Sequence, residues 1–273
     1  DPDTGEPAMT RARIASADTA AIAHAFTGAR RTGRALPSYP GAVPTTLAEA
    51  YGIQDAAIAL WPDPVAGWKV ARIGPPHAAR VGADRLAGPI FARAVWPAGT
   101  EPVRVGVIEN GYAAVEGEYV LKLGQTPPLR DDWTAASVAA LVSDVFIGVE
   151  IAGSPFAGIN DFGPTVTVSD FGNNAGLVLG SRVTDWSTRL DDLSGEMWLD
   201  GIRVGSGGAR VIPDGPLGAL AFLLNHLTGR GRQAEAGQLI STGATTGVHP
   251  VTAGQQALAS FGSDGQIACL AVP

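Results

Sequence analysis

The sequence contains one cysteine, Cys269, and only four histidines. A single cysteine cannot form an internal disulfide, and it cannot supply the several thiolates of a structural zinc or iron–sulfur site. We therefore expect a reducing, cytoplasmic location. The histidines do not have the spacing of metal ligands, and His226 falls within an apolar segment that is typical of a buried helix.

Positive charge and long apolar runs are also scarce. The net charge is −7 and the isoelectric point is near 5.0, with no basic cluster. These values argue against binding to nucleic acids or anionic membranes, because such surfaces need concentrated lysine and arginine. No apolar stretch approaches the roughly 20 residues that a membrane-spanning helix requires. The first ten residues, DPDTGEPAMT, lack a signal-peptide core.

The remaining patterns predict an α+β protein. Residues 16–31 and 45–60 are alanine-rich and amphipathic, which predicts two helices joined by a loop rich in proline and glycine. From Gly67 onward, short β-rich segments alternate with glycine and proline, and two helices are expected at 133–145 and 214–231. We predict an N-terminal helical segment over residues 1–66 and a catalytic domain over 67–273. Met9 is taken as the natural start, with residues 1–8 as a cloning remnant.

The segment AVEGEYVLKLG, residues 114–124, places two carboxylates close together. If it is a strand, Glu116 and Glu118 share one face, because successive side chains alternate between faces. Glu150 lies in a similar apolar strand. Three such carboxylates can bind Mg²⁺ or Mn²⁺, which prefer oxygen ligands. Alternatively, Glu116 and Glu118 lie on the solvated face of an edge strand and Glu150 pairs with an arginine.

Lys69 follows Trp68 in another apolar strand, and it is one of only two lysines in the chain. Its stem could simply cover the sheet while the ammonium group reaches solvent. Beside a metal-bound substrate, the same ammonium group would stabilise developing negative charge or transfer a proton. No G-x-S-x-G, H-E-x-x-H or Walker motif offers a competing catalytic centre.

Several short motifs resemble, in their order and spacing, the 2-keto-4-pentenoate hydratase family of the fumarylacetoacetate hydrolase superfamily. The resemblance extends from residue 26 to the C-terminus. The matching segments are GWKV at 67–70, EGEYVLKLG at 116–124, Glu150, SDFGNNAGLVLG at 169–180, GPLGALAFLLNHL at 215–227 and AEAGQLISTG at 234–243.

The resemblance implies a mixed, highly curved β-sheet roll with an N-terminal helical part, and a homo-oligomeric assembly. It implies that Glu116, Glu118 and Glu150 bind Mg²⁺ or Mn²⁺ and that a small 2-oxo acid chelates this ion. Lys69 and Asp170 are the candidate catalytic residues. The candidate substrate-binding residues are Thr242, Gly243, Ile73 and Phe171.

Three positions depart from the family pattern. Ile73 stands where many members carry a threonine, Phe171 replaces an asparagine, and Leu86 lies where an acidic turn is common. All three residues are apolar, and apolar groups cannot pair a second substrate carboxylate. We therefore expect a preference for a monocarboxylic 2-oxo acid with an apolar tail.

The expected reaction is metal-dependent addition of water to a 2-hydroxy-alka-2,4-dienoate, giving a 4-hydroxy-2-oxo acid. Two alternatives stay open on the sequence. One is a 2-oxo acid decarboxylase or a C–C hydrolase of the same superfamily. The other is a non-catalytic protein that binds a metal or a small acid in the same carboxylate cup.

Overall fold

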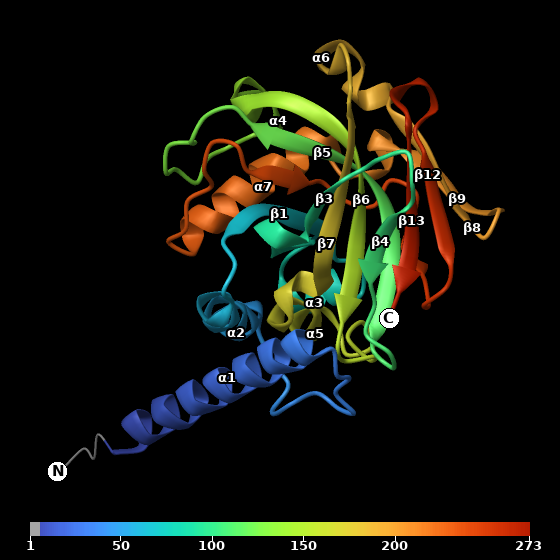
Figure 1. Ribbon diagram of the computed structural model, residues 1–273. Helices are drawn as coiled ribbons and strands as arrows, with labels where there is room; N and C mark the ends of the chain where they lie inside the picture. The colour runs from blue at the N-terminus through green and yellow to red at the C-terminus, as the bar shows by residue number, and fades with distance from the viewer. Residues whose placement is uncertain (1–5) are drawn as a thin grey trace.

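The computed structural model describes the backbone of residues 6–273 and the side chains from residue 18 onward. Residues 1–5 lie outside the described part, so the expectation of a remnant at residues 1–8 falls partly outside it. The helices are α1 (Glu6–Thr32), α2 (Leu47–Leu60), α3 (His77–Val81), α4 (Ala135–Val138), α5 (Pro164–Ser169), α6 (Trp186–Arg189) and α7 (Gly215–Gly229) (Figure 1).

The strands form two sheets. They are β1 (Val65–Arg72), β2 (Arg85–Phe91), β3 (Val95–Pro97), β4 (Val103–Gly106), β5 (Tyr112–Leu123), β6 (Val142–Ser154), β7 (Asn174–Arg182), β8 (Ser194–Leu199), β9 (Ile202–Gly208), β10 (Leu239–Ser241), β11 (His249–Pro250), β12 (Gln256–Ser260) and β13 (Gln266–Val272). The larger sheet has the order β2-β1-β10-β5-β6-β7-β3, with β11 also paired to β5. The smaller sheet has the order β4-β13-β12-β8-β9. This mixed, curved architecture confirms the predicted α+β fold class.

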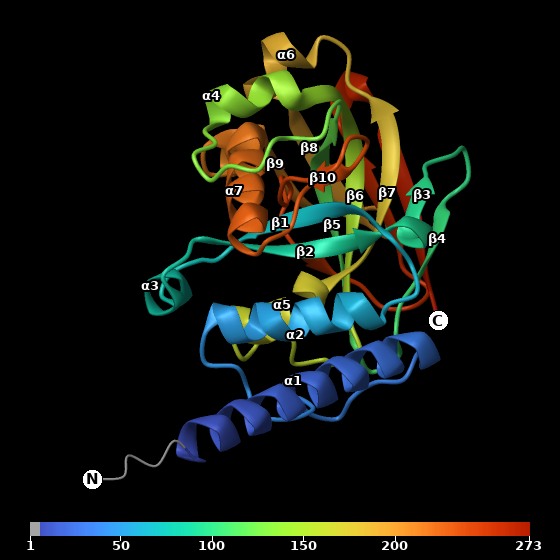
Figure 2. The ribbon, with the colours of Figure 1, turned by 90° about the vertical axis from the view of Figure 1, so that its left-hand side faces the viewer.

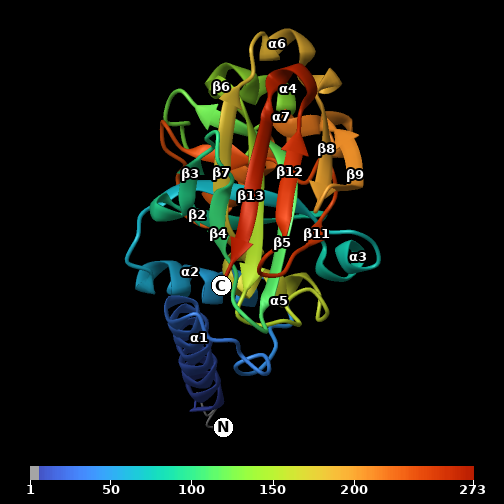
Figure 3. The ribbon, with the colours of Figure 1, turned by 45° about the vertical axis from the view of Figure 1, so that its right-hand side comes forward.

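The two sheets pack against each other around one large core. In Figure 3, β12 and β13 lie in front of β5, β6 and β7. Buried side chains from both layers meet there, including Tyr119 and Ile147 from the larger sheet and Ile267 from the smaller one. The Phe261 and Tyr119 rings also pack edge to face, with ring centroids 5.4 Å apart. The core therefore lies between the sheets, and β5 and β6 are interior strands.

Helices α1 and α2 lie together at one end of the larger sheet, as Figure 2 shows, while α7 packs beside β1. Ile22 and Phe26 of α1 pack with Ile53 of α2 in a second core that also includes Phe91 and Phe171. The N-terminal helices thus share a core with the sheet, and the division of the chain near residue 66 stays a prediction. None of the described helices is long and apolar enough to span a membrane.

The helix expected over residues 133–145 is largely wrong. Helix α4 covers only Ala135–Val138, a short 3₁₀ turn follows, and β6 already begins at Val142. The reason is pairing: Val142 and Val145 lie opposite Leu123 and Leu121 of β5, and their side chains are buried. Strand pairing and burial outweigh the local helical pattern here. Residues 133–141 supply only the capped turn that leads into the strand.

Candidate metal and active site

Three glutamates meet in the middle of the larger sheet. Glu116 of β5 lies directly opposite Glu150 of β6, and Glu118 lies two residues further along the same face of β5. The side chains are buried, with exposed fractions of 6% for Glu116 and 0% for both Glu118 and Glu150. One oxygen from each lies within 4.8 Å of the others. The solvated edge-strand alternative is therefore wrong.

The hydrogen bonds to these carboxylates leave two oxygens unsatisfied. Glu118 Oε2 accepts from the Ser241 hydroxyl and, at 3.0 Å, from the backbone N–H of Gly243. Glu150 Oε1 accepts from Asn174 at 3.0 Å. By contrast, Glu118 Oε1 and Glu150 Oε2 are buried without a hydrogen-bond partner. Burying an unpaired carboxylate oxygen is costly, and a divalent cation between the three carboxylates would remove that cost. The donor set therefore fits Mg²⁺ or Mn²⁺.

The protonation behaviour of the glutamates agrees with this geometry. Burial, reinforced by the neighbouring Glu150 carboxylate and partly offset by Lys69, raises the pKa of Glu116 to about 8. Burial and the charges of Glu150 and Glu116 raise the pKa of Glu118 well above its usual range. The protein alone thus resists holding three negative charges here. An added cation would supply the missing compensation.

Lys69 lies next to this cluster, so the snorkelling alternative is wrong. Its side chain is buried, and Nζ lies 3.1 Å from Glu150 Oε1 and 3.1 Å from the carbonyl oxygen of Gly172. Glu150 therefore pairs with a lysine and not with an arginine. Burial lowers the pKa of Lys69, but the surrounding Glu150, Glu116 and Glu118 carboxylates raise it more, so the net direction is upward. The group is held as an ammonium ion.

Strand pairing explains how distant segments reach this cluster. Strand β10 runs parallel to β1, with Ser241 opposite Lys69, and antiparallel to β5 on its other side. The loop after β10 then continues alongside β5. Thr245 N–H donates to the Gly117 carbonyl at 2.9 Å, and the Thr242 hydroxyl donates to the Tyr119 carbonyl at 2.7 Å. This loop therefore forms a wall beside the glutamates.

A cavity of about 750 Å³ opens onto Glu116 and Lys69. Its volume is within the range of sites for small metabolites. Three predicted substrate-binding residues, Ile73, Thr242 and Gly243, line it. Polar residues that the sequence analysis did not assign to the site also line it: Arg72, His77, Arg85, Asn160, Thr167, Asn173 and Ser206.

The structure does not bring Asp170 and Phe171 to this cavity. The Asp170 carboxylate is buried and accepts from Arg30 Nε at 2.6 Å and from the Ser154 hydroxyl at 2.6 Å. The Phe171 ring packs against Trp61 and Phe91, with centroids 5.6 and 4.9 Å away, and borders a separate cavity of about 210 Å³. The expectation that Phe171 makes part of the main pocket apolar is therefore wrong. Leu86 does line the main cavity.

Some missed residues carried a weak sequence signal. Arg72 and Arg85 lie at the ends of β1 and β2, where they are paired with each other in the sheet register. Asn173 lies within residues 169–180, one of the segments that resemble the family. His77 and Asn160 lie in regions whose position relative to Lys69 depends on tertiary structure. No spacing rule links them to the glutamates.

Comparisons with known proteins agree with the fold. No family model matches the chain. A 2-oxo-hept-4-ene-1,7-dioate hydratase from Escherichia coli is 33% identical over 104 residues, which is 38% of this chain and 39% of that protein. The match thus spans about two fifths of the curated relative.

Solved structures match over a longer range. A 4-oxalocrotonate decarboxylase from Pseudomonas putida G7, complexed with magnesium and adipate, aligns with a TM-score of 0.78 and 20% identity, covering 93% of this chain and 97% of that one. A fumarylpyruvate hydrolase from Pseudomonas aeruginosa with Mn²⁺ and pyruvate aligns with a TM-score of 0.56 and 16% identity, covering 77% and 91%. These identities establish the fold alone. Together with the partial sequence match to a hydratase, the shared fold supports the resemblance to the fumarylacetoacetate hydrolase superfamily.

Proposed function

We propose that this protein is a divalent-metal-dependent hydratase that converts a 2-hydroxy-alka-2,4-dienoate into a 4-hydroxy-2-oxo acid. The observation that carries the proposal is a cluster of three buried glutamates, two of whose oxygens are unsatisfied, beside a cavity that Glu116 and the buried Lys69 line. The partial match to a hydratase supports the reaction type. Mg²⁺ or Mn²⁺ is the proposed cofactor, and we also propose a cytoplasmic homo-oligomer.

The chain's own residues suit chemistry on a 2-oxo acid. Glu116, Glu118 and Glu150 would hold the ion, which supplies Lewis-acid polarisation of a bound oxo group when it is present. Lys69 keeps its proton because of the carboxylates around it, so it can stabilise negative charge that develops on the substrate. Thr242, Gly243 and Ile73 line the cavity and would orient the substrate.

The alternatives of the sequence analysis differ in what happens to the polarised substrate. The decarboxylase and the hydrolase among the structural relatives support these as competing reactions of the same site. The non-catalytic alternative would be favoured if Lys69 faced away from the glutamates, whereas its ammonium group contacts Glu150. The proposed catalytic role of Asp170 lacks support from the cavity lining. Its contacts favour a role in positioning.

The first experiment follows the ultraviolet absorbance of a 2-hydroxypenta-2,4-dienoate with purified protein and Mg²⁺ or Mn²⁺, and identifies the products by mass. Addition of one water is expected, and chelation of the metal should abolish it. Glu116→Gln, Glu118→Gln and Glu150→Gln should each weaken Mn²⁺ binding severely in calorimetric titration. Release of carbon dioxide or of a shorter acid would replace the hydratase proposal by one of the alternatives. Unchanged Mn²⁺ affinity in all three variants would remove the metal site.

One observation favours a dicarboxylic substrate as a second candidate, against the monocarboxylic preference expected from the sequence. Arg72 lines the cavity, is exposed, and makes no side-chain hydrogen bond or ion pair within residues 18–273. The charge of Arg85 is already offset, because Asp84 and Asp214 lie 3.9 and 3.5 Å from its guanidinium group. The relatives named for a dioate and crystallised with adipate support this candidate.

The comparison of two substrates decides between these candidates. If Arg72 binds a distal carboxylate, Arg72→Met should lower kcat/KM for the dicarboxylate by roughly tenfold or more, as expected for a charged hydrogen bond of about 1.5–3 kcal/mol. Turnover of the monocarboxylate should not change. Arg104→Met, on the exposed side of β4 in the other sheet, is the matched control. Equal losses on both substrates would exclude Arg72 as the group that distinguishes them.

A further inference from the structure

The segment Asp170–Asn174, which we call the bridge, connects α5 to β7 and has an unusual backbone. Phe171, Gly172 and Asn173 have consecutive positive φ angles of 54°, 62° and 65°. Glycine adopts this region freely and asparagine tolerates it, but a bulky phenylalanine adopts it only with steric strain. Such a conformation persists only where its surroundings enforce it. The bridge is therefore a strained element held from outside.

The bridge touches the candidate metal site at two points. The carbonyl of Gly172 accepts a hydrogen bond from Lys69 Nζ at 3.1 Å. The side-chain amide of Asn174 donates to Glu150 Oε1 at 3.0 Å. Between these two residues, Asn173 lines the cavity, and its Oδ1 is buried without a partner. The path of the bridge thus sets the positions of one glutamate and the lysine.

Strand β2 leaves room for this close approach. Gly88 lies opposite Lys69 in the pairing of β1 and β2. A side chain there would be impossible without movement, because its Cβ would come within 2.1 Å of the Phe171 carbonyl oxygen. The Phe171 ring in turn lies against Trp61 and Phe91. The bridge is therefore fixed against the strand that neighbours the lysine.

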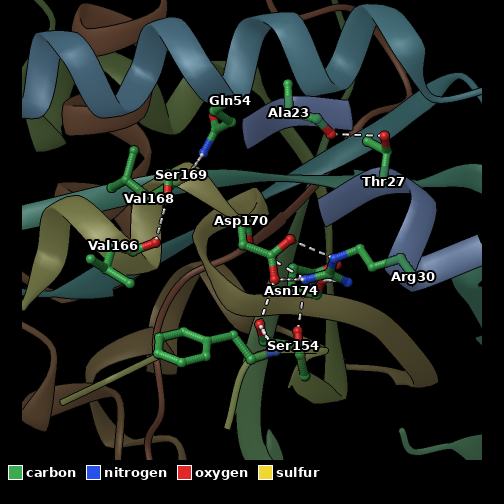
Figure 4. A network of polar contacts seen from close by, with 12 residues as sticks. Ala23, Thr27, Arg30, Gln54, Ser154, Val166, Val168, Ser169, Asp170 and Asn174 are labelled. Carbon is green, nitrogen blue, oxygen red and sulfur yellow. Dashed lines mark hydrogen bonds and ion pairs between the residues drawn. The ribbon is translucent and has the colours of Figure 1, made fainter. Parts of the chain in front are cut away.

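Arg30, near the end of α1, holds both ends of the bridge, as Figure 4 shows. Its Nε and Nη2 donate to the two carboxylate oxygens of Asp170 at 2.6 and 2.9 Å. Its Nη1 donates to the carbonyl of Asn174 at 3.0 Å, and Nη2 also donates to the carbonyl of Gly153 at 2.7 Å. The guanidinium group lies over the Phe171 ring, 5.1 Å from its centroid. Arg30 itself is nine-tenths buried.

We propose that Arg30 is a positioning residue of the active site and that it acts through the bridge. It does not line the main cavity, yet it fixes the segment whose atoms bind Lys69 and Glu150. Helix α1 thereby helps to position the residues of the site. The kinetic part of this inference rests on the proposed reaction, whereas the metal-binding part rests only on the proposed metal site.

The variants separate positioning from simple stability. Arg30→Met removes the fork of hydrogen bonds and keeps the apolar stem. Arg30→Lys keeps the charge, but a single ammonium group cannot replace the planar fork, so it should rescue only in part. Thr27→Val is the matched control, because Thr27 is buried one turn earlier on α1 and its hydroxyl donates to the Ala23 carbonyl of the same helix at 2.8 Å.

The measurements are Mn²⁺ affinity by calorimetry, Tm, and kcat and KM. We expect Arg30→Met to weaken Mn²⁺ binding about 10- to 100-fold, the usual effect of removing a group that orients a metal ligand. We also expect kcat to fall by more than KM changes. Thr27→Val should change Tm and leave Mn²⁺ affinity unaltered. Asp170→Asn should reproduce the Arg30→Met effect, and the double variant should add little to it.

Other outcomes have definite meanings. If Arg30→Met lowers Tm but keeps Mn²⁺ affinity and kcat within twofold of the parent protein, Arg30 is purely structural and the inference is overturned. If Arg30→Met does not fold, Arg30→Lys and Asp170→Asn carry the same test with smaller perturbations. If the parent protein binds Mn²⁺ but turns over no 2-oxo acid, the proposed function fails, and the Mn²⁺ titrations still decide the role of Arg30.

Discussion

At the scale of single residues, Lys69 is the group on which the proposed chemistry depends most. Lys69→Met keeps the stem and removes the charge, so kcat should fall by roughly two orders of magnitude or more. Mn²⁺ affinity should stay the same or increase, because a positive charge 3.1 Å from Glu150 is removed. Steady-state kinetics and calorimetry on the same preparation measure both effects.

Lys122 provides the control for this prediction. It is the other lysine of the chain, lies near the end of β5 and does not line the cavity. Lys122→Met should therefore retain the kcat of the parent protein. A Lys69→Met enzyme with near-normal kcat would mean that the ammonium group serves only to neutralise Glu150.

Sequence reasoning finds site residues where local rules govern their direction. Strand alternation predicts that Glu116 and Glu118 share a face, and the structure places them so. Asp170 carries a carboxylate that could act in catalysis. The direction of its side chain depends on Arg30, which lies 140 residues away in the sequence. The orientation of the Phe171 side chain depends on its left-handed backbone conformation, which no local sequence pattern predicts. Such positions are decided by tertiary contacts.

At the scale of secondary-structure elements, α2 allows stability to be separated from the site. The Thr46 side chain accepts from the Glu49 N–H at 3.2 Å, and the Glu49 carboxylate accepts from the Thr46 N–H at 3.3 Å, which forms a capping box. Thr46→Ala should lower the free energy of unfolding by about 1 kcal/mol. Urea unfolding measures this loss. Mn²⁺ affinity should not change, and a change would show that the start of α2 is coupled to the glutamates.

Elements with strong local patterns agree with the sequence expectations, whereas some weakly patterned ones were not expected. Helices α2 and α7 and the central strands β1 and β5 lie close to their predicted ranges. Strands β8 and β9 were not expected, since β9 is glycine-rich and largely exposed. It exists because the ladder to β8 holds it in place. Pairing with a neighbour, and not propensity, defines such strands.

At the scale of the whole molecule, a half-buried histidine predicts how stability depends on pH. His226 of α7 lies 4.4 Å from the Tyr51 ring of α2 and is stacked on Phe222. Burial, assisted by the Arg230 charge, lowers the pKa of His226 from 6.5 to about 4. The unfolded chain therefore binds more protons than the native state between these pH values. Stability from this group is complete above pH 6.5 and is lost as the pH falls toward 4.

The expected loss is up to about 3 kcal/mol across that interval, at 1.36 kcal/mol per pKa unit. Urea unfolding at several pH values between 4.5 and 7.5 measures the slope. His226→Phe keeps an aromatic ring and removes the titration, so its stability should vary less with pH over this range. Parallel slopes for the two proteins would assign the acid sensitivity to other groups.

The distribution of the metal-site residues along the chain has a consequence for the lifetime of the native state. Glu118 of β5 accepts a hydrogen bond from Ser241 of β10, which lies 123 residues away in the sequence. Glu150 of β6 forms an ion pair with Lys69 of β1. Strands β1, β10, β5 and β6 must therefore all be assembled before the three glutamates, Lys69 and Ser241 lie together. A divalent ion should therefore bind only after the rate-limiting step of folding. It should leave the folding rate unchanged and slow unfolding, so that the loaded protein persists longer.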